Sequence, residues 1–411
     1  MRAAVLVTGD EVLGGRVAER NAGFLARSLA ERGIAVMRTL IVGDSLDEVQ
    51  KGLAALVGLG VDLVCTTGGL GPTYDDLTMA AVATATGRPL QLDSDALAMV
   101  EERTGSVAHR LNVDATDLDR MRRKQAMLPD GAIVLPPIGT APGCTLAHDG
   151  TLVVVLPGPP WELTGMWHAA LASGPLADLV GRHTGAHTRT FRLWSVFEAE
   201  LVPVLDVLGT QALDRIGTYT RDGELEIVVP EDLGEEVRTL LSERFASALF
   251  ATDDRHVDAL VAAALVARGE TLAVGESCTG GGLGGRLTAI SGASEWFVGG
   301  AITYSNAAKT SLLGVDPVVI ASRGAVSRDC VEQMAEGARR ITGATWGVGI
   351  TGIAGPDGGT PDKPVGLVWI GIAGPDGVHA HEHRLVRADR EGIRRRAQTA
   401  ALHHLRIALG C

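Results

Sequence analysis

The sequence is poor in aromatic residues, in cysteine and in long hydrophobic runs, and each shortage excludes a class of protein. Aromatic side chains make up only 4% of the 411 residues, too few to be interleaved with basic residues as in grooves for single-stranded nucleic acid. The five cysteines are far apart and form no Cys-x-x-Cys pair, which excludes a disulfide or zinc framework. No apolar run approaches the ~18 residues of a membrane-spanning helix. The first apolar run is also too short for a signal peptide, so we expect a cytoplasmic protein with no membrane partner.

Positive charge is also scarce. There are 37 basic and 49 acidic residues, and the formal net charge of −12 repels polyanions. We therefore expect no direct contact with nucleic acid. The chain is rich in glycine instead, with 53 residues where average usage would give about 29, and this favours loops in which the backbone approaches a ligand closely.

The order of apolar and amphipathic stretches predicts an α/β protein. In the first part of the chain, strands expected at 3–8, 36–42 and 61–66 alternate with helices at 21–32 and 47–59, the pattern of βα units around a largely parallel sheet. This region predicts a first α/β domain at 1–170. Polar loops follow the strands, where open α/β sheets bind ligands.

The second half of the chain changes pattern twice. Two strand-like runs, each followed by a helix-like run, predict a small α+β connector at 171–255. Strands then alternate with helices again, which predicts a second α/β domain at 256–411. The sequence Ile-Ala-Gly-Pro-Asp-Gly occurs at 353–358 and again at 372–377. The second copy has the residues of a hairpin turn, and the first, in a longer loop, is the better candidate for ligand contact.

A serine, a lysine and a tyrosine follow neighbouring strands of the second α/β domain. Ser277 stands between a strand and a helix-compatible run, where unpaired amides at the helix start would stabilise an oxyanion. Tyr304 and Lys309 follow the next predicted strand, and a buried lysine with a lowered pKa can act as a general base for a serine. The residues alone also allow Ser277 as a helix N-cap with Lys309 in solvent, or Cys278 as the nucleophile.

Two further clusters carry weaker signals. In the first domain, 68–71 is a glycine-rich turn whose amides can face an anion, and nearby carboxylates can hold a divalent metal that bridges a pyrophosphate. Ordinary turns and N-caps have the same composition. In the last domain, His379, His381 and His383 alternate along a predicted strand. This spacing permits metal binding, although an exposed hairpin edge explains it better.

Several segments together resemble one known family. They are Glu-Ser-Cys-Thr-Gly-Gly at 276–281, Gly-Ala-Ser-Glu-Trp-Phe at 292–297, Tyr-Ser-Asn-Ala-Ala-Lys at 304–309, Gly-Ala-Val-Ser at 324–327, and 351–359 with Lys-Pro-Val-Gly at 363–366. These closely resemble the C-terminal domain of the CinA (competence/damage-inducible protein A) family, a nicotinamide mononucleotide (NMN) amidohydrolase. The segments 8–15, 68–76 and 157–162 are similar to the family's molybdopterin-binding-like domain, which is associated with metal-dependent ADP-ribose pyrophosphatase activity.

The resemblance implies roles for individual residues. It makes Ser277 the nucleophile, Lys309 the base and Tyr304 its partner, with no cofactor. The implied substrate contacts are Thr279, Gly280, Thr351, Gly352, Asp357 and, for the phosphate, Arg390 and Arg394. The implied N-terminal site comprises Asp10, Glu11, Gly69 and Gly71, with Asp75, Asp76 and Glu162 as ligands of magnesium or cobalt, with or without potassium.

The resemblance thus predicts an NMN deamidase of pyridine nucleotide salvage that acts as a homodimer. One alternative gives the chain a second or principal activity as an ADP-ribose pyrophosphatase in the N-terminal domain. Another is a nucleotide- or pterin-binding protein linked to competence.

Overall fold

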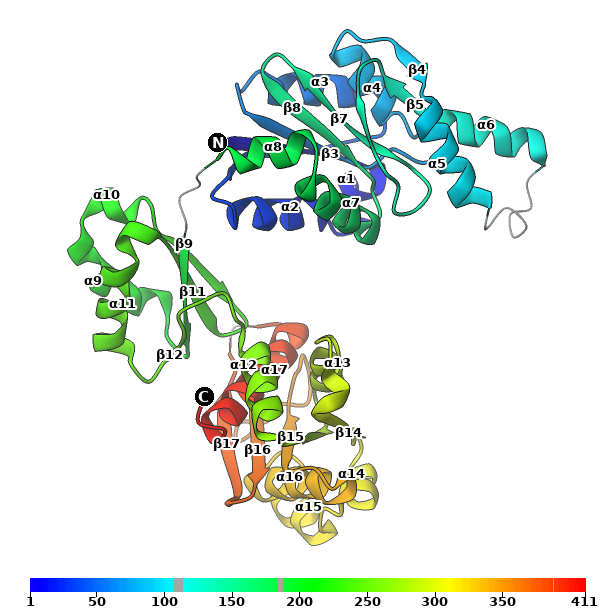
Figure 1. The fold of residues 1–411 in the computed structure, drawn as a ribbon. Coiled ribbons are helices and arrows are strands. Elements are labelled where there is room, and N and C mark those ends of the chain that lie inside the picture. Colours follow the sequence, from blue (N-terminus) through cyan, green and yellow to red (C-terminus); the bar gives the residue numbers. More distant parts are fainter. Residues whose placement is uncertain (106–113, 184–187, 387) are drawn as a thin grey trace. The chain divides into compact units, whose positions relative to one another are not determined.

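The chain divides into two compact units, Met1–His187 and Thr188–Cys411. The computed structural model describes residues 1–105, 114–183, 188–386 and 388–411 (Figure 1). Both units combine sheets with helices, which confirms the predicted α/β class. Of the predicted connector at 171–255, residues 188–255 lie with the C-terminal domain in the second unit, and residues 171–183 belong to the first unit. Among the helices so described, none is both long and apolar enough to cross a bilayer.

The first unit is built on a six-stranded sheet with the order β2-β1-β3-β8-β7-β6. The first four strands are parallel, as predicted, and the last two are antiparallel. The bounds are β1 Arg2–Thr8, β2 Ala35–Val42, β3 Leu63–Thr67, β6 Ile133–Leu135, β7 Gly143–His148 and β8 Thr151–Leu156. The sequence analysis missed β6 and β7, since β6 has three residues and β7 lacks an alternating pattern.

Helices cover both faces of this sheet (Figure 1). One face packs against α3 (Leu46–Val57) and α4 (Thr78–Ala85), the other against α2 (Asn21–Ala30), α7 (Pro160–Ala172) and α8 (Pro175–Gly181). Helix α3 begins where the Ser45 side chain accepts a hydrogen bond from the Glu48 amide. Its apolar stripe then buries Val49, Leu53 and Leu56. The short helix α1 (Asp10–Leu13) follows β1.

A smaller part of the first unit lies beyond the sheet. It contains the two-stranded pair β4 (Leu90–Leu92) and β5 (Met127–Pro129) and the helices α5 (Ser94–Gly105) and α6 (Ala115–Gln125). Residues 106–113 lie outside the described residues.

The second unit begins with the connector, a four-stranded antiparallel sheet of order β10-β11-β9-β12. Its strands are β9 Thr188–Trp194, β10 Gly217–Arg221, β11 Glu224–Pro230 and β12 Leu249–Ala251. Its helices are α9 Glu198–Leu205, η2 Asp206–Leu208, α10 Thr210–Leu213 and α11 Glu231–Phe245. Phe191, Leu225 and Ile227 from the sheet and Val237 and Leu241 from α11 form its core. The sequence predicted β9 and β11 but not the short edge strands.

The rest of the second unit is a five-stranded sheet of order β14-β13-β15-β16-β17. Strands β13 to β15 are parallel, and β16 and β17 form the predicted antiparallel hairpin across the 372–377 turn. The strands are β13 Leu272–Glu276, β14 Phe297–Ile302, β15 Trp346–Gly352, β16 Leu367–Gly374 and β17 Gly377–Arg384.

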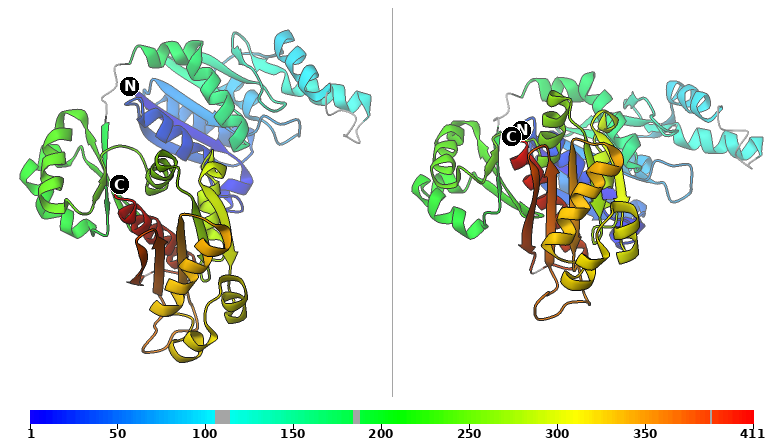
Figure 2. Two further views of the ribbon diagram at one scale, coloured as in Figure 1. Left: turned by 60° about the horizontal axis from the view of Figure 1, so that its bottom comes forward. Right: turned by 90° about the horizontal axis from the view of Figure 1, so that it is seen from below.

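Helices cover both faces of this sheet as well, as the two views of Figure 2 show. Helices α12 (Val257–Arg268), α13 (Gly282–Thr288) and α17 (Arg390–Ala408) pack on one face. Helices α14 (Asn306–Leu313), α15 (Pro317–Arg323) and α16 (Arg328–Thr342) cover the other, and η3 (Ala293–Glu295) precedes β14.

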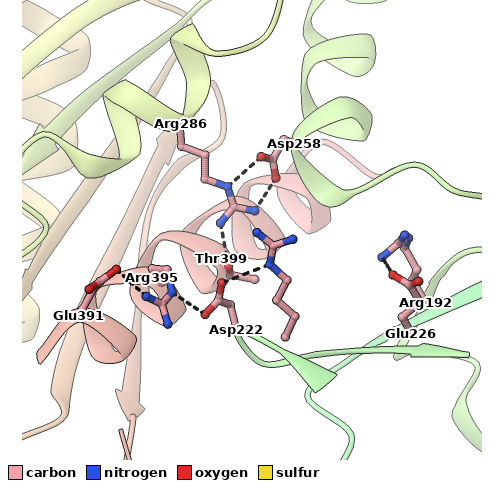
Figure 3. Close-up of polar contacts among 9 residues, drawn as sticks. Arg192, Asp222, Glu226, Asp258, Arg286, Glu391, Arg395 and Thr399 are labelled. Carbon is pink, nitrogen blue, oxygen red and sulfur yellow. Dashed lines mark hydrogen bonds and ion pairs between the residues drawn. The ribbon is translucent and has the colours of Figure 1, made fainter. Parts of the chain in front are cut away.

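Within the second unit, the connector contacts helix α17 through ion pairs and stacked rings. Asp222, in the turn between β10 and β11, accepts a hydrogen bond from Arg395 at 3.0 Å (Figure 3). Trp194 stacks on the buried ring of His403, with 4.5 Å between ring centroids. The Nε2 atom of His403 lies 2.8 Å from the Glu224 carboxylate. The connector therefore shares buried surface with the last helix.

Two of the three alternating histidines of β17, His381 and His383, pack against α17 and are partly buried, whereas the sequence predicted an exposed hairpin edge. The His381 ring stacks on His404, and His383 Nε2 lies 2.7 Å from His404 Nε2. Burial and the neighbouring imidazoles lower the pKa of His404 to about 3, so this ring is neutral near pH 7. In the part of the chain described, no group of three or more His, Cys, Asp or Glu side chains is arranged to hold a metal ion.

Candidate active site

Ser277 directly follows the carboxyl end of β13, an interior strand of the five-stranded sheet. Its amide donates a hydrogen bond to the Ile350 carbonyl of the neighbouring strand at 2.9 Å. The chain then turns sharply through Gly280 and Gly281, with φ of +59° and +90°. These left-handed values favour glycine, which explains why two glycines follow the serine. The turn leaves the Ser277 side chain at the edge of the sheet, where strands β14 and β15 also end.

Lys309 reaches Ser277 from helix α14. The helix starts at Ser305, whose side chain accepts a hydrogen bond from the Ala308 amide. Lys309 lies one turn further on, where its side chain is 1% exposed. Its Nζ atom lies 2.8 Å from Ser277 Oγ and 2.8 Å from the Thr303 carbonyl oxygen. Burial lowers the pKa of Lys309, which makes a neutral amine beside the serine hydroxyl accessible at lower pH.

Cys278 is a poor nucleophile in this environment. Its side chain is only 6% exposed, and burial raises the pKa of the thiol to about 12. The thiolate is the reactive form of cysteine, so Cys278 stays protonated near pH 7. The geometry favours Ser277 over Cys278.

Tyr304 contacts an arginine rather than the lysine. Its side chain is 61% exposed, and its hydroxyl accepts a hydrogen bond from Arg390 at 2.7 Å. The same guanidinium donates to the Gly355 carbonyl. Arg390 thus links the tyrosine to the loop that carries the first Ile-Ala-Gly-Pro-Asp-Gly copy, and this arginine belongs to the first turn of α17.

A cavity of about 280 Å³ opens onto these side chains. Seven of the residues to which the family resemblance gives a role line this cavity. They are Ser277, Tyr304, Lys309, Thr351, Gly352, Asp357 and Arg390. The first repeat copy supplies much of another wall, and Cys278, Asn306, Ala325 and Val326 complete the lining. The Thr351 hydroxyl donates to the Ala325 carbonyl at 2.9 Å and so joins two walls.

Three implied substrate contacts lie outside this cavity. Thr279 is fully buried, and its carbonyl accepts a hydrogen bond from Arg394 at 2.7 Å. Gly280 lies in the adjoining turn. Arg394 lines a neighbouring hollow of about 470 Å³ together with Arg390. Because Arg390 lines both spaces, the serine cavity adjoins a hollow that holds Arg390, Arg394 and Arg395 together with the carboxylates of Asp389 and Glu391.

Two residues near the site were missed by sequence reasoning. Glu276 ends β13 and is 1% exposed, an unusual position for a carboxylate. Lys363 donates from Nζ to the carbonyls of Arg323 and Val326, at 2.6 Å and 2.8 Å. It thereby ties the tip of the repeat loop to the turn that forms the opposite wall. In both cases the sequence feature that could have pointed to the residue is a charged side chain within a motif of small residues.

The first unit has its own cavity, of about 600 Å³, at the carboxyl ends of β1, β3 and β8. The predicted residues in its lining are Glu11, Gly69, Gly71, Asp75, Asp76 and Glu162. Asp44, which the sequence analysis missed, also lines it. The Asp10 amide donates to Asp44 at 2.9 Å, and burial raises the pKa of the Asp44 carboxyl, with Asp10, Glu11 and Asp75 adding to the rise against the hydrogen bond from Asp10.

Two of the three implied metal ligands of this cavity have other partners in the structure. The Thr73 hydroxyl lies 2.5 Å from Asp75 and 2.7 Å from Asp76, and the two carboxylates share its one proton. Burial raises the pKa of Glu162, which disfavours its charged form. Since the described residues contain no metal-binding group, Asp75, Asp76 and Glu162 as placed do not fit a metal, and we derive no step through one.

The fold and the site define an α/β protein with a buried serine–lysine pair in its second unit. Comparisons with known proteins match both the N-terminal and the C-terminal part of the chain to described families. A family model described as "Probable molybdopterin binding domain" matches residues 4–175, and one described as "CinA C-terminal domain" matches residues 254–409. A "CinA-like protein" from Mycolicibacterium vanbaalenii is 44% identical, over 99% of this chain and 98% of its own. One from Mycobacterium tuberculosis is 39% identical, over 99% and 97%.

Solved structures match part of the chain. The protein CinA from Thermoplasma acidophilum is 34% identical and covers 44% of this chain and 99% of its own, with a TM-score of 0.38. A competence/damage-inducible protein from Agrobacterium tumefaciens is 38% identical and covers 39% and 100%, with a TM-score of 0.37. On the full-length matches, the chain belongs to the CinA family, with a molybdopterin-binding-like domain in its N-terminal part.

Proposed function

We propose that the second unit hydrolyses the carboxamide of nicotinamide mononucleotide to give nicotinate mononucleotide and ammonia. The observation that carries this proposal is the distance of 2.8 Å between Lys309 Nζ and Ser277 Oγ in a buried setting that lowers the pKa of the lysine. The choice of substrate follows from the family resemblance. The cavity volume of about 280 Å³ suits a pyridine ring with its carboxamide.

The chemistry requires the same amine to take up a proton and release it twice. Ser277 Oγ attacks the carboxamide carbon while Lys309 takes its proton, and the carbonyl oxygen becomes an oxyanion. The lysine ammonium then protonates the leaving nitrogen, which departs as ammonia and leaves an acyl-serine. A water molecule attacks this ester while Lys309 takes the water proton, and Lys309 then returns this proton to Ser277 Oγ as the acid leaves.

The arginines of α17 are suited to the phosphate. Arg390 lines both the serine cavity and the adjoining hollow, and Arg394 faces the hollow. A mononucleotide with its ring beside Ser277 would extend toward these guanidinium groups, which bind phosphate by charge-assisted hydrogen bonds. Arg390 also orients Tyr304, so it contributes to both ends of the substrate site.

The test is ammonia release from NMN by the full-length protein, with nicotinate mononucleotide identified by chromatography. We expect turnover that an excess of chelator leaves unchanged, because serine, lysine and backbone amides supply nucleophile, base and oxyanion donors. A folded protein that releases no ammonia would reject the proposal. Loss of activity on chelation without unfolding would favour a metal-activated water.

We also propose ADP-ribose as the substrate of the first unit, on the strength of its cavity of about 600 Å³ with glycine-rich turns at three strand ends. Asp76 accepts hydrogen bonds from both the amide and the hydroxyl of Thr73, at 2.9 Å and 2.7 Å, and so holds a cavity loop in place.

This arrangement predicts that the two reactions are independent. In Asp76→Ala, the cavity loop loses both bonds, and we expect AMP release from ADP-ribose to fall about tenfold, equivalent to about 1.4 kcal/mol. NMN deamidation should stay within twofold of wild type, because Ser277 lies in the other unit. Both assays are run on one preparation, and a parallel fall in deamidation would contradict independence.

A further inference from the structure

Glu276 is a buried carboxylate that the reaction steps above do not use. It lies immediately before Ser277 at the end of β13 and is 1% exposed. Its Oε2 atom accepts hydrogen bonds from the amides of Gly281 and Leu283, both at 3.1 Å. Its Oε1 atom accepts one from the Gly284 amide at 2.8 Å. All three donors belong to the turn after Ser277 and the first residues of α13.

Through these bonds, the Glu276 carboxylate occupies the place at the start of α13 where an anionic ligand could otherwise bind. A buried carboxylate is tolerated only when hydrogen bonds replace its lost water, and bonds from amides to a charged oxygen are strong. The amides of Gly281, Leu283 and Gly284 are therefore occupied before a substrate arrives. This corrects the expectation that the helix start as a whole would stabilise the oxyanion, because an internal carboxylate holds that place.

The amides nearer the serine are in a different situation. In the turn itself, the Gly280 amide donates to the Ser277 carbonyl at 3.0 Å, and the Gly282 amide donates to the Thr279 carbonyl at 3.1 Å. Among the described residues, no acceptor in another residue is found for the Cys278 or Thr279 amide, and the Cys278 amide bonds only to its own sulfur. Of these two residues, only Cys278 lines the serine cavity. The amide after the nucleophile is a common oxyanion donor.

We propose that Glu276 is a positioning residue, whose hydrogen bonds to three amides fix the turn after Ser277 so that the Cys278 amide serves as the oxyanion donor. Glu276 itself touches neither the substrate nor the serine oxygen. The proposal rests on the proposed function only in taking Ser277 as the nucleophile, and it holds for any acyl group that enters the cavity.

Two measurements on the full chain separate positioning from folding. The first is kcat and KM for NMN. The second is the reaction of Ser277 with a fluorophosphonate, in which the Oγ–P bond forms, fluoride leaves from phosphorus and Lys309 takes the serine proton. Intact mass over time gives both the rate constant and the final extent of labelling. A purely structural defect lowers the final extent, whereas a misplaced oxyanion donor lowers the rate constant.

In Glu276→Gln, an amide nitrogen replaces one acceptor oxygen and faces backbone donors. We expect kcat and the labelling rate constant to fall about 10- to 100-fold, less than the ~10²- to 10³-fold effect of removing an oxyanion donor outright, with KM within threefold. Glu270→Gln is the matched control, because the Glu270 carboxylate is also partly buried and accepts a hydrogen bond from Trp346 Nε1 at 2.7 Å, away from the cavity. Its rate constants should stay within twofold.

The outcomes are distinct. A labelling rate constant within threefold of wild type in Glu276→Gln, or no labelling of the wild type at Ser277, would overturn the inference. If Glu276→Gln does not fold by circular dichroism, Glu276→Asp replaces it, because the shorter carboxylate keeps its charge but cannot span all three amides. If the wild type releases no ammonia from NMN while labelling still depends on Glu276, the proposed substrate fails and the positioning role stands.

Discussion

Ser277→Ala is expected to abolish NMN deamidation, with a fall in kcat of ~10³-fold or more. The only hydrogen bond found for its hydroxyl in the described chain is with Lys309, so the variant loses its nucleophile and little else. One such bond contributes about 1 kcal/mol, and the melting temperature should fall by no more than about 2–4 °C for a unit of this size. The measurements are ammonia release and thermal unfolding.

Cys278→Ala is the matched control for this change. Its thiol is buried, protonated and adjacent to the serine, and we expect the variant to keep most of its activity. An inactive Cys278→Ala beside an active Ser277→Ala would show that the nucleophile is assigned to the wrong residue.

The second large effect is expected for Lys309→Met, which keeps the length of the side chain and removes the amine. Loss of the general base should lower kcat by ~10²-fold or more. KM for NMN should change little, since Arg390 and Arg394 are left in place. A kcat within threefold of wild type would exclude the lysine as base.

The pH dependence gives an independent check on the same residue. The neutral amine is the active form, so the wild-type rate should fall as pH decreases through the pKa of Lys309. Burial lowers this pKa from its ordinary value of 10.5, which places the fall below pH 10.5. In Lys309→Met this limb of the profile should disappear. An identical limb in the variant would assign it to another group.

The sequence was sufficient to place the serine and lysine in the same region, because both follow strands of one parallel sheet. Carboxyl ends of adjacent parallel strands meet at one edge, and β13 and β14 are such neighbours. Ser305 marks the start of α14, which places Lys309 one turn inside the helix. The order of strands and the helix N-cap therefore sufficed to predict that this pair lies close together, and the family resemblance added the roles of nucleophile and base.

Long-range contacts could not be predicted in this way. Arg390 reaches Tyr304 across 86 residues of sequence, and His404 meets His381 and His383 only because α17 packs beside β17. The amide bonds of Glu276 also depend on the shape of one turn. Such contacts result from how elements pack, and neither hydrophobic periodicity nor composition carries that information.

The buried contact between the connector and α17 has a practical consequence for work with recombinant fragments. Trp194 and Phe250 of the connector pack against the C-terminal core, and Glu224 pairs with His403, which is fully buried. A fragment that starts at residue 254, where the match to the CinA C-terminal domain begins, would expose this imidazole and its apolar surroundings to water. A fragment from Thr188 keeps them covered. Poor solubility of the shorter fragment would therefore result from the surface that the connector normally covers, and would say nothing about the chemistry at Ser277.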